Sequence, residues 1–289
     1  MVQLEHIQSF FPAHVRNNPK HQKYMLKEYI QLLILEHLSN TFHIRKMAFI
    51  GGTNLRLVRG IDRFSEDLDF DCKQMSEQDF AEMSEGILSF LRRIGWKAEI
   101  REKVSDRLTA FRKNIYFPEL LFKLGLSGHK EERFLIKIES QDQKVDYTPV
   151  MANIKGCGFF FQFPVPPDDV LCAMKISALL SRQKGRDFYD AMFLLSQTTP
   201  NYDYLTQKCN IHNWTKLSEI LIKITEQTDL KRKSQDFEHL LFQTGNSNKI
   251  LLFKEFIMDY KDDTRKSNSK ITHFSRKIEV ILKKTKIWT

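Results

Sequence analysis

Apolar residues in the first half of the chain recur with two different periods, which predicts a mixture of helices and strands. Helical spacing runs through residues 19–39, after Asn18-Pro19, a dipeptide suited to a helix start. A second amphipathic helix is expected over 76–93, where a capping box opens at Ser76. Short apolar runs at 46–50 and 68–70 indicate buried strands, separated by a short helix over 54–59. Further β-like runs are expected at 97–102, 107–117, 120–124 and 134–139.

The pattern changes near residue 165 and then becomes almost wholly helical. The run Phe163-Pro164-Val165-Pro166-Pro167 should break any regular element and mark a domain junction. Helices are expected over 170–183, capped by Asp168 or Asp169, and over 187–196, with Gly185 between them. We therefore predict an α+β fold: a mixed sheet with flanking helices in residues 1–165, followed by a helical domain over 166–289.

The composition favours a basic protein with a sizeable core. The 289 residues are 42% hydrophobic, and 45 Lys+Arg against 36 Asp+Glu give a formal net charge of +9. Such an excess favours polyanionic partners, nucleic acid first, although a solvated basic surface explains charge alone equally well. For the basic tail we favour a solvated face over a phosphate-contacting arm; its lysines are Lys277, Lys283, Lys284 and Lys286.

The cysteines and the apolar runs exclude several classes of protein. The four cysteines lie far apart without a CxxC pair, which argues against a zinc site and against a disulfide framework. Residues 1–14 lack the basic start and apolar run of a signal peptide. The longest apolar stretch, 32–35, is too short to span a bilayer. We expect a soluble cytoplasmic protein with no membrane partner.

A glycine pair follows the first predicted strand. A strand that runs into Gly51-Gly52 and then a helix exposes backbone N–H groups, and these groups together with the helix dipole attract phosphate. Thr53 can add a hydroxyl at the cap position. Taken alone, Gly-Gly-Thr is more often a tight turn. No Walker A sequence is present, so the P-loop mode of phosphate binding is excluded.

Acidic residues alternate with apolar ones in the second predicted strand. Period two places Asp67, Asp69 and Asp71 on one face and the apolar residues between them on the other. Like charges on one face repel, and a divalent cation would offset that repulsion. An EF-hand loop fits poorly because Cys72 occupies the position of the required glycine. The structural alternative is a soluble acidic strand edge.

The turn and the aspartates together indicate a two-metal site. The turn can bind the β- and γ-phosphates of a nucleoside triphosphate, while two metal ions bridge the aspartates and the α-phosphate. This arrangement suits the in-line attack of a hydroxyl, with the metals stabilising the attacking and leaving oxygens.

These residues resemble the signature of the AbiEii/AbiGii-type nucleotidyltransferases, toxins of bacterial toxin–antitoxin and phage-defence systems within the DNA polymerase β-like superfamily. The family pattern combines a Gly-Gly-Ser/Thr turn, an Arg-Phe-Ser-Glu-Asp-Leu-Asp-Phe run and a later Lys…Arg…Arg-Asp-x-Tyr-Asp helix pair. Here these are residues 51–53, residues 63–70, and Lys175, Arg182 and residues 186–190. Order and spacing match over about 45–195, whereas the C-terminal third carries no matching motif.

The resemblance implies a nucleotidyltransferase-type α+β catalytic domain, a helical second domain and a nucleotide that enters the cleft between them. It implies catalytic roles for Asp67, Asp69, Lys175 and Asp187, and two Mg²⁺ ions on the aspartates. Nucleotide contacts are implied at a larger set, namely Gly51, Gly52, Thr53, Arg63, Lys175 and Arg182. Asp187 could equally be the cap of its helix and pair with Arg186 or Arg182.

Catalysis in this superfamily usually adds a third carboxylate on a neighbouring strand. The run 134–139 alternates, so that Lys137 and Glu139 share one face. Glu139 is the candidate for a catalytic and metal-binding role, and Asp146 is the alternative.

The favoured function is transfer of a nucleotide from an NTP to an RNA acceptor, with the tRNA 3′ end preferred. A toxin of this family also implies a cognate antitoxin. The alternatives are an enzyme of the same fold that modifies a protein or a small hydroxylated molecule, and an inert binding module.

Overall fold

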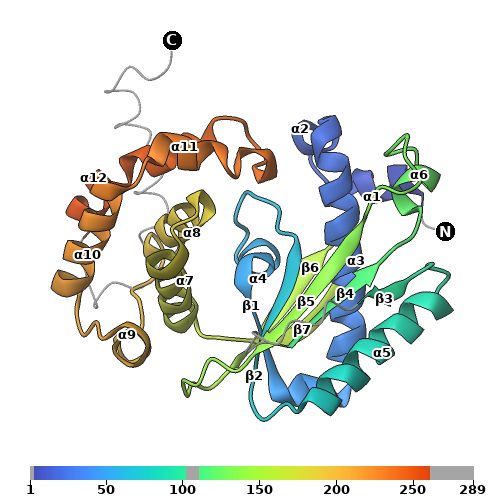
Figure 1. Ribbon diagram of the computed structural model, residues 1–289, viewed down its shortest axis with the longest axis horizontal. Coiled ribbons are helices and arrows are strands. Elements are labelled where there is room, and N and C mark those ends of the chain that lie inside the picture. The colour runs from blue at the N-terminus through green and yellow to red at the C-terminus, as the bar shows by residue number, and fades with distance from the viewer. Residues whose placement is uncertain (1–2, 102–110, 261–289) are drawn as a thin grey trace. The chain divides into compact units, whose positions relative to one another are not determined.

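The computed structural model describes residues 3–101 and 111–260 (Figure 1). The first part of the strand expected at 107–117 and the basic tail at 277–286 lie outside these ranges. The chain forms two compact units. Among the described residues, the first contains those up to Pro167 together with Glu238–Thr244, and the second contains Asp168–Phe237 and residues 245–260.

The first unit is built on a mixed sheet, as predicted. Its strand order is β1-β2-β5-β4-β3, in which β2 and β5 are parallel and the other neighbours are antiparallel. A separate antiparallel pair, β6 and β7, follows in the chain. The strands are β1 (Met47–Ile50), β2 (Asp67–Cys72), β3 (Glu99–Arg101), β4 (Phe111–Tyr116), β5 (Leu135–Gln141), β6 (Val150–Gly156) and β7 (Phe159–Val165).

Alternation along the central strands separates an apolar face from a polar one. Ile136 and Ile138 of β5 are fully buried, while Lys137 and Glu139 between and beyond them are only half-buried. This confirms the prediction that Lys137 and Glu139 lie on the same face of the strand. The parallel pairing of β2 with β5 aligns their buried residues, so one face forms the core.

Two long helices pack on the apolar face of this sheet (Figure 1). Helix α3 (Gln22–Ser39) contacts β5 and β7, and α5 (Glu77–Arg93) contacts β4 through stacked rings of Phe80 and Phe111. The predicted capping box of α5 is confirmed, because Asp79 N donates to Ser76 Oγ at 3.0 Å and Ser76 N donates to Asp79 Oδ2 at 2.9 Å. Both predicted helices are therefore present.

Shorter helices complete the first unit. The helix predicted at 54–59 begins earlier, at the glycine pair itself. The helices are α1 (Leu4–Ser9), α2 (Ala13–Arg16), α4 (Gly51–Leu57) and α6 (Leu120–Lys123), with 3₁₀ turns at Pro19–His21, Phe42–Lys46 and Glu238–Leu240.

Two predictions for this unit were wrong. The run 120–124 is helical, not β-like: Leu120–Lys123 form α6, with Leu120 and Leu121 buried, and an apolar run this short fits either structure. The expected break at 163–167 is also wrong in its first part, since Phe163 to Val165 complete β7. Pro164 is tolerated there because the two-stranded pair leaves one side of β7 without a strand partner.

The second unit is helical, as predicted. The interruption expected near Gly185 separates two helices, and Gln183 adopts a positive φ of 49° just before it. The helices are α7 (Asp168–Arg182), α8 (Gly185–Leu195), α9 (Tyr202–Cys209), α10 (Trp214–Gln227), α11 (Leu230–Gln235) and α12 (Phe253–Asp259), with a 3₁₀ segment at Asn246–Leu252. Within the residues that the structure describes, no helix has the length and apolar character needed to cross a membrane.

Candidate active site

The glycine turn lies directly against an aspartate of β2. Gly51 has φ +81°, and a Cβ built on it would lie only 2.1 Å from Asp69 Oδ2. The register explains this proximity, because antiparallel pairing sets Ile50, the last residue of β1, opposite Asp69. The candidate phosphate-binding turn and a candidate metal ligand are therefore adjacent, as the sequence analysis required.

The second glycine is equally confined. A Cβ on Gly52 would lie 2.6 Å from Ser65 Oγ and 3.0 Å from Arg63 Nη2. Helix α4 begins here, and the side chain of its N-cap residue, Ile50, makes no capping hydrogen bond. The first backbone N–H groups of a helix have no acceptor within the helix, which is why a helix start can bind phosphate.

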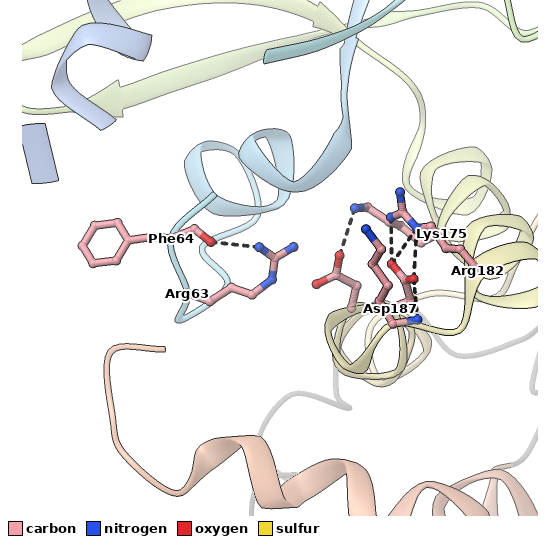
Figure 2. A network of polar contacts seen from close by, with 7 residues as sticks. Arg63, Phe64, Lys175, Arg182 and Asp187 are labelled. Carbon is pink, nitrogen blue, oxygen red and sulfur yellow. Dashed lines mark hydrogen bonds and ion pairs between the residues drawn. The ribbon is translucent and has the colours of Figure 1, made fainter. Parts of the chain in front are cut away.

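Arg63 supports the turn from within the protein. Only 1% of the residue is exposed, and its Nη1 donates a 2.9 Å hydrogen bond to the carbonyl of Phe64 (Figure 2). The backbone around it is held by a β-bridge between Arg63 and Leu241 and by a hydrogen bond from Phe64 N to Leu240 O at 2.9 Å. Its contact with a nucleotide stays a prediction, whereas its packing under Gly52 is an observed structural role.

Two polar side chains tie α4 to the adjoining strands. The hydroxyl of Thr53 donates to the carbonyl of Asp67. Asn54 Nδ2 donates to the carbonyl of Phe49 at 2.6 Å, and both side chains are buried. The turn is therefore a rigid connection between β1 and β2. The phosphate contact expected of Thr53 stays a prediction.

The polar face of the sheet carries cations as well as carboxylates. The register of β2 and β5 pairs Asp67 with Lys137 and Asp69 with Glu139. Lys137 Nζ lies 2.9 Å from Asp67 Oδ2 and 3.3 Å from Glu139 Oε1. Burial lowers the pKa of Lys137, but the hydrogen bond to Asp67 and the charges of both carboxylates outweigh it and raise that pKa above its ordinary value. Arg112 of β4 forms a further ion pair with Glu139.

These ion pairs correct one step of the sequence argument. The repulsion between the carboxylates was expected to require a divalent cation, but Lys137 and Arg112 already offset it. The aspartates alone are thus weaker evidence for metal than their spacing suggested.

Asp71, the third aspartate of the alternation, belongs to a separate cluster. It accepts hydrogen bonds from Tyr147 Oη at 2.6 Å and Gln143 N at 2.8 Å. Burial raises its pKa, and these hydrogen bonds act in the opposite direction. The alternative third carboxylate, Asp146, is fully exposed and pairs with Lys73 at 3.0 Å.

The donor set nevertheless fits a hard divalent cation. Asp67 and Asp69 offer carboxylate oxygens from one face of β2, and Glu139 lies in register beside Asp69. Across residues 3–101 and 111–260, no group of three or more His, Cys, Asp or Glu side chains is arranged to hold a metal by itself. Magnesium is often held by one or two carboxylates together with substrate phosphates, which is the mode these residues suit.

The residues expected in the second unit form two ion pairs between α7 and α8. Lys175 Nζ lies 2.9 Å from Asp190 Oδ2, and both side chains are buried. Arg182 binds Asp187 through Nε and Nη2 at 2.7–3.1 Å (Figure 2). Asp187, the third residue of α8, also accepts from the backbone N of the N-cap residue Lys184 at 3.1 Å. The expected pairing of Asp187 with Arg182 is thus observed, whereas the N-cap residue is Lys184 and not Asp187.

Sequence reasoning missed several residues of these networks. Lys137 was placed on the correct face but given no role, although its neighbours in the alternation were a usable signal. Asp190 stands at the end of the matched motif and was not selected. Ser65 lies inside the matched run 63–70 but was not selected, and Arg112 gave no signal, because its proximity depends on chain pairing that periodicity does not reveal.

Comparisons with known proteins agree with this geometry. The family model described as nucleotidyl transferase AbiEii toxin, type IV toxin–antitoxin system, matches residues 33–243, well over half of the chain. A search of curated proteins found no match.

Two solved structures share the fold. MenT4, a nucleotidyltransferase toxin from Mycobacterium tuberculosis H37Rv, superposes with a TM-score of 0.57 at 17% identity, over 98% of this chain and 99% of that one. JHP933 from Helicobacter pylori has a TM-score of 0.51 at 18% identity, over 89% and 97% of the two chains. At these identities the likeness shows a common fold.

Proposed function

The chain belongs to the family of AbiEii nucleotidyltransferase toxins of type IV toxin–antitoxin systems, and from this premise we propose that it transfers a nucleoside monophosphate from an NTP to RNA. The acceptor we favour is the 3′ end of tRNA, and the cofactor is Mg²⁺. The family implies an NTP substrate and a cognate antitoxin. We further propose that the protein acts in the cytoplasm.

One observation supports this function above the others: the carboxylate of Asp69 lies against Gly51, at the first turn of α4. Phosphate-binding N–H groups and a metal-binding carboxylate must be neighbours if one triphosphate is to contact both. The pairing of Ile50 with Asp69 provides that proximity. An acidic strand edge without function would not need it.

In the proposed reaction, a ribose hydroxyl of the acceptor attacks the α-phosphorus of the NTP. A new O–Pα bond forms, the bond from Pα to the bridging oxygen breaks, and pyrophosphate leaves with that oxygen while the hydroxyl proton passes to a base. The turn at Gly51 and Gly52 binds the terminal phosphates through its backbone N–H groups. Asp67 and Asp69 would hold the divalent cation, which would neutralise charge on the phosphates. The roles of Glu139, Lys175, Arg182 and Asp187 stay predictions.

The net charge of +9 supports a polyanionic acceptor. The test is incubation of the protein with each α-labelled NTP, Mg²⁺ and total tRNA. We expect label on tRNA, whereas label on the protein or on a small molecule would identify another acceptor. Absence of transfer to any of them would favour an inert binding module.

The substitution Asp69→Ala tests whether the proposed metal-binding carboxylate is needed for transfer. Because Asp69 is half-buried and lies on the polar face, we expect its loss to abolish transfer while the far-UV circular dichroism stays that of the wild type. Transfer that survives this substitution would exclude the proposed site. Lys155→Ala, an exposed position on β6, is the control that should change neither measurement.

A further inference from the structure

Lys137, on the carboxylate face, carries a charge that opposes the binding of a cation between Asp67 and Glu139. Its Nζ lies 2.9 Å from the first and 3.3 Å from the second carboxylate. About a quarter of each of these three side chains is exposed, 28%, 28% and 24% for Lys137, Asp67 and Glu139. Lys137 therefore occupies a position that joins two strands at the site, and it is not a surface lysine with an incidental partner.

The position of Lys137 is fixed by the fold. Parallel pairing sets it directly opposite Asp67, and Glu139 follows two residues later on the same face. Arg112, opposite Glu139 on β4, adds a second cation. Among the residues that the structure describes on this face, these two cations lie with three carboxylates, Asp67, Asp69 and Glu139.

We propose that Lys137 is a built-in cation that takes the place of one of the two divalent ions usual for two-metal catalysis. Its Nζ lies between the carboxylates of Asp67 and Glu139, so that Asp69, beside the glycine turn, would be the principal protein ligand of a single ion. Without nucleotide the face has little net charge with which to hold a divalent cation, so the ion enters with the triphosphate. This inference rests on the proposed function, because it concerns the same site.

The first test counts bound ions in the full-length wild-type protein. Mn²⁺ is titrated in the presence of a non-hydrolysable NTP analogue, and free Mn²⁺ is measured by electron paramagnetic resonance. With protein in excess over the analogue, we expect one Mn²⁺ per bound analogue in total, including the ion that the analogue brings with it. Two such ions would overturn the inference, and no variant needs to fold for this result to be read.

The second test removes the charge and omits the nucleotide. Lys137→Gln raises the net negative charge of the face by one, so we expect Mn²⁺ to bind about tenfold more tightly than to the wild type, the size of effect that one nearby charge has on an ionic equilibrium. Lys137→Arg keeps the charge and should bind Mn²⁺ as weakly as the wild type does.

The matched control is Lys113→Gln. Lys113 lies on the adjacent strand β4, but it pairs with Ile138 and so belongs to the opposite face. Its loss of one positive charge should leave Mn²⁺ affinity unchanged. Equal affinity of Lys137→Gln and Lys113→Gln would overturn the inference. Failure of the proposed function is seen separately, as absence of label transfer by the wild-type enzyme.

Discussion

At the scale of single residues, Gly51 and Gly60 have a similar backbone and different surroundings. Their φ angles are +81° and +74°. A Cβ on Gly51 would lie 2.1 Å from Asp69 Oδ2, whereas no described atom lies within 4 Å of a Cβ on Gly60. The pair therefore separates the cost of an unfavourable φ from the cost of displacing Asp69.

We expect Gly51→Ala to abolish nucleotide transfer and to destabilise the fold by more than the roughly 1–2 kcal/mol that a left-handed backbone costs a non-glycine residue. Gly60→Ala should show only that backbone cost and keep its transfer activity. Urea unfolding and the labelled-NTP assay measure both effects. Equal stability and equal transfer activity of the two variants would mean that the contact between Gly51 and Asp69 contributes nothing to function.

The residue pattern predicted which side chains share one face of a central strand. It did not predict which strands pair with each other. Alternation was enough to place Asp67 with Asp69 and Lys137 with Glu139, because side chains on a strand alternate whatever the neighbour is. The register that sets Lys137 opposite Asp67 depends on which strands pair and in which direction. Local sequence does not contain that information, so the charge balance of the site could not be predicted.

At the scale of elements, a buried ion pair joins α7 to α8. We expect it to stabilise the fold, and one of its residues, Lys175, is also predicted to contact the nucleotide. Lys175 and Asp190 lie 2.9 Å apart, with 8% and 1% of their side chains exposed. Removing one partner of such a pair leaves a buried charge without compensation, which costs about 3–5 kcal/mol, whereas replacing both by apolar residues is often neutral.

We therefore expect Asp190→Leu to lower the free energy of unfolding by about 3–5 kcal/mol and Lys175→Met/Asp190→Leu to recover most of it. If Lys175 also binds the triphosphate, the recovered double variant should still fail to transfer nucleotide. Chemical denaturation and the transfer assay give the two readings. A stable and active double variant would show that Lys175 has only a structural role.

The sequence predicted correctly those features that depend only on residues close together in the chain. The capping box of α5 and the glycine interruption between α7 and α8 depend on neighbouring residues alone. Helix α6 and strand β7 were misread, because an apolar run as short as 120–124 fits either structure and proline is admitted in a strand with one free side. Tertiary packing decided both cases.

At the scale of the whole molecule, three buried or half-buried histidines make stability depend on pH. Burial is the main cause that lowers the pKa of His21, His37 and His43 from 6.5. Below that value the unfolded chain binds protons that the folded chain does not, so the free energy of unfolding falls as pH decreases.

Urea unfolding should thus show lower stability at about pH 5.5 than at about pH 7.5, a window above the titration of ordinary carboxylates. His37→Gln, which removes the ring stacked on Phe90, should show a smaller difference between the two pH values. Equal stability of the wild type at both values would contradict the inferred burial of these rings.

The division of the chain into units was only partly visible in the sequence. The change from mixed to helical pattern and the proline run near 165 both derive from local composition. The return of Glu238–Thr244 to the first unit does not, because it depends on a bridge between Arg63 and Leu241, far apart in the sequence. Long-range pairing of this kind leaves no periodic signal.

The central claim is that the β2 aspartates hold a divalent cation beside a glycine turn that binds triphosphate. A crystal structure of the full chain with a non-hydrolysable NTP analogue and Mn²⁺ tests it most directly, because anomalous scattering locates the ion. We predict an anomalous peak at about 2.1–2.3 Å from a carboxylate oxygen of Asp69, with phosphate oxygens on the backbone N–H groups of the turn. A triphosphate bound away from Gly51 and Gly52, or an ion without contact to Asp69, would contradict the account.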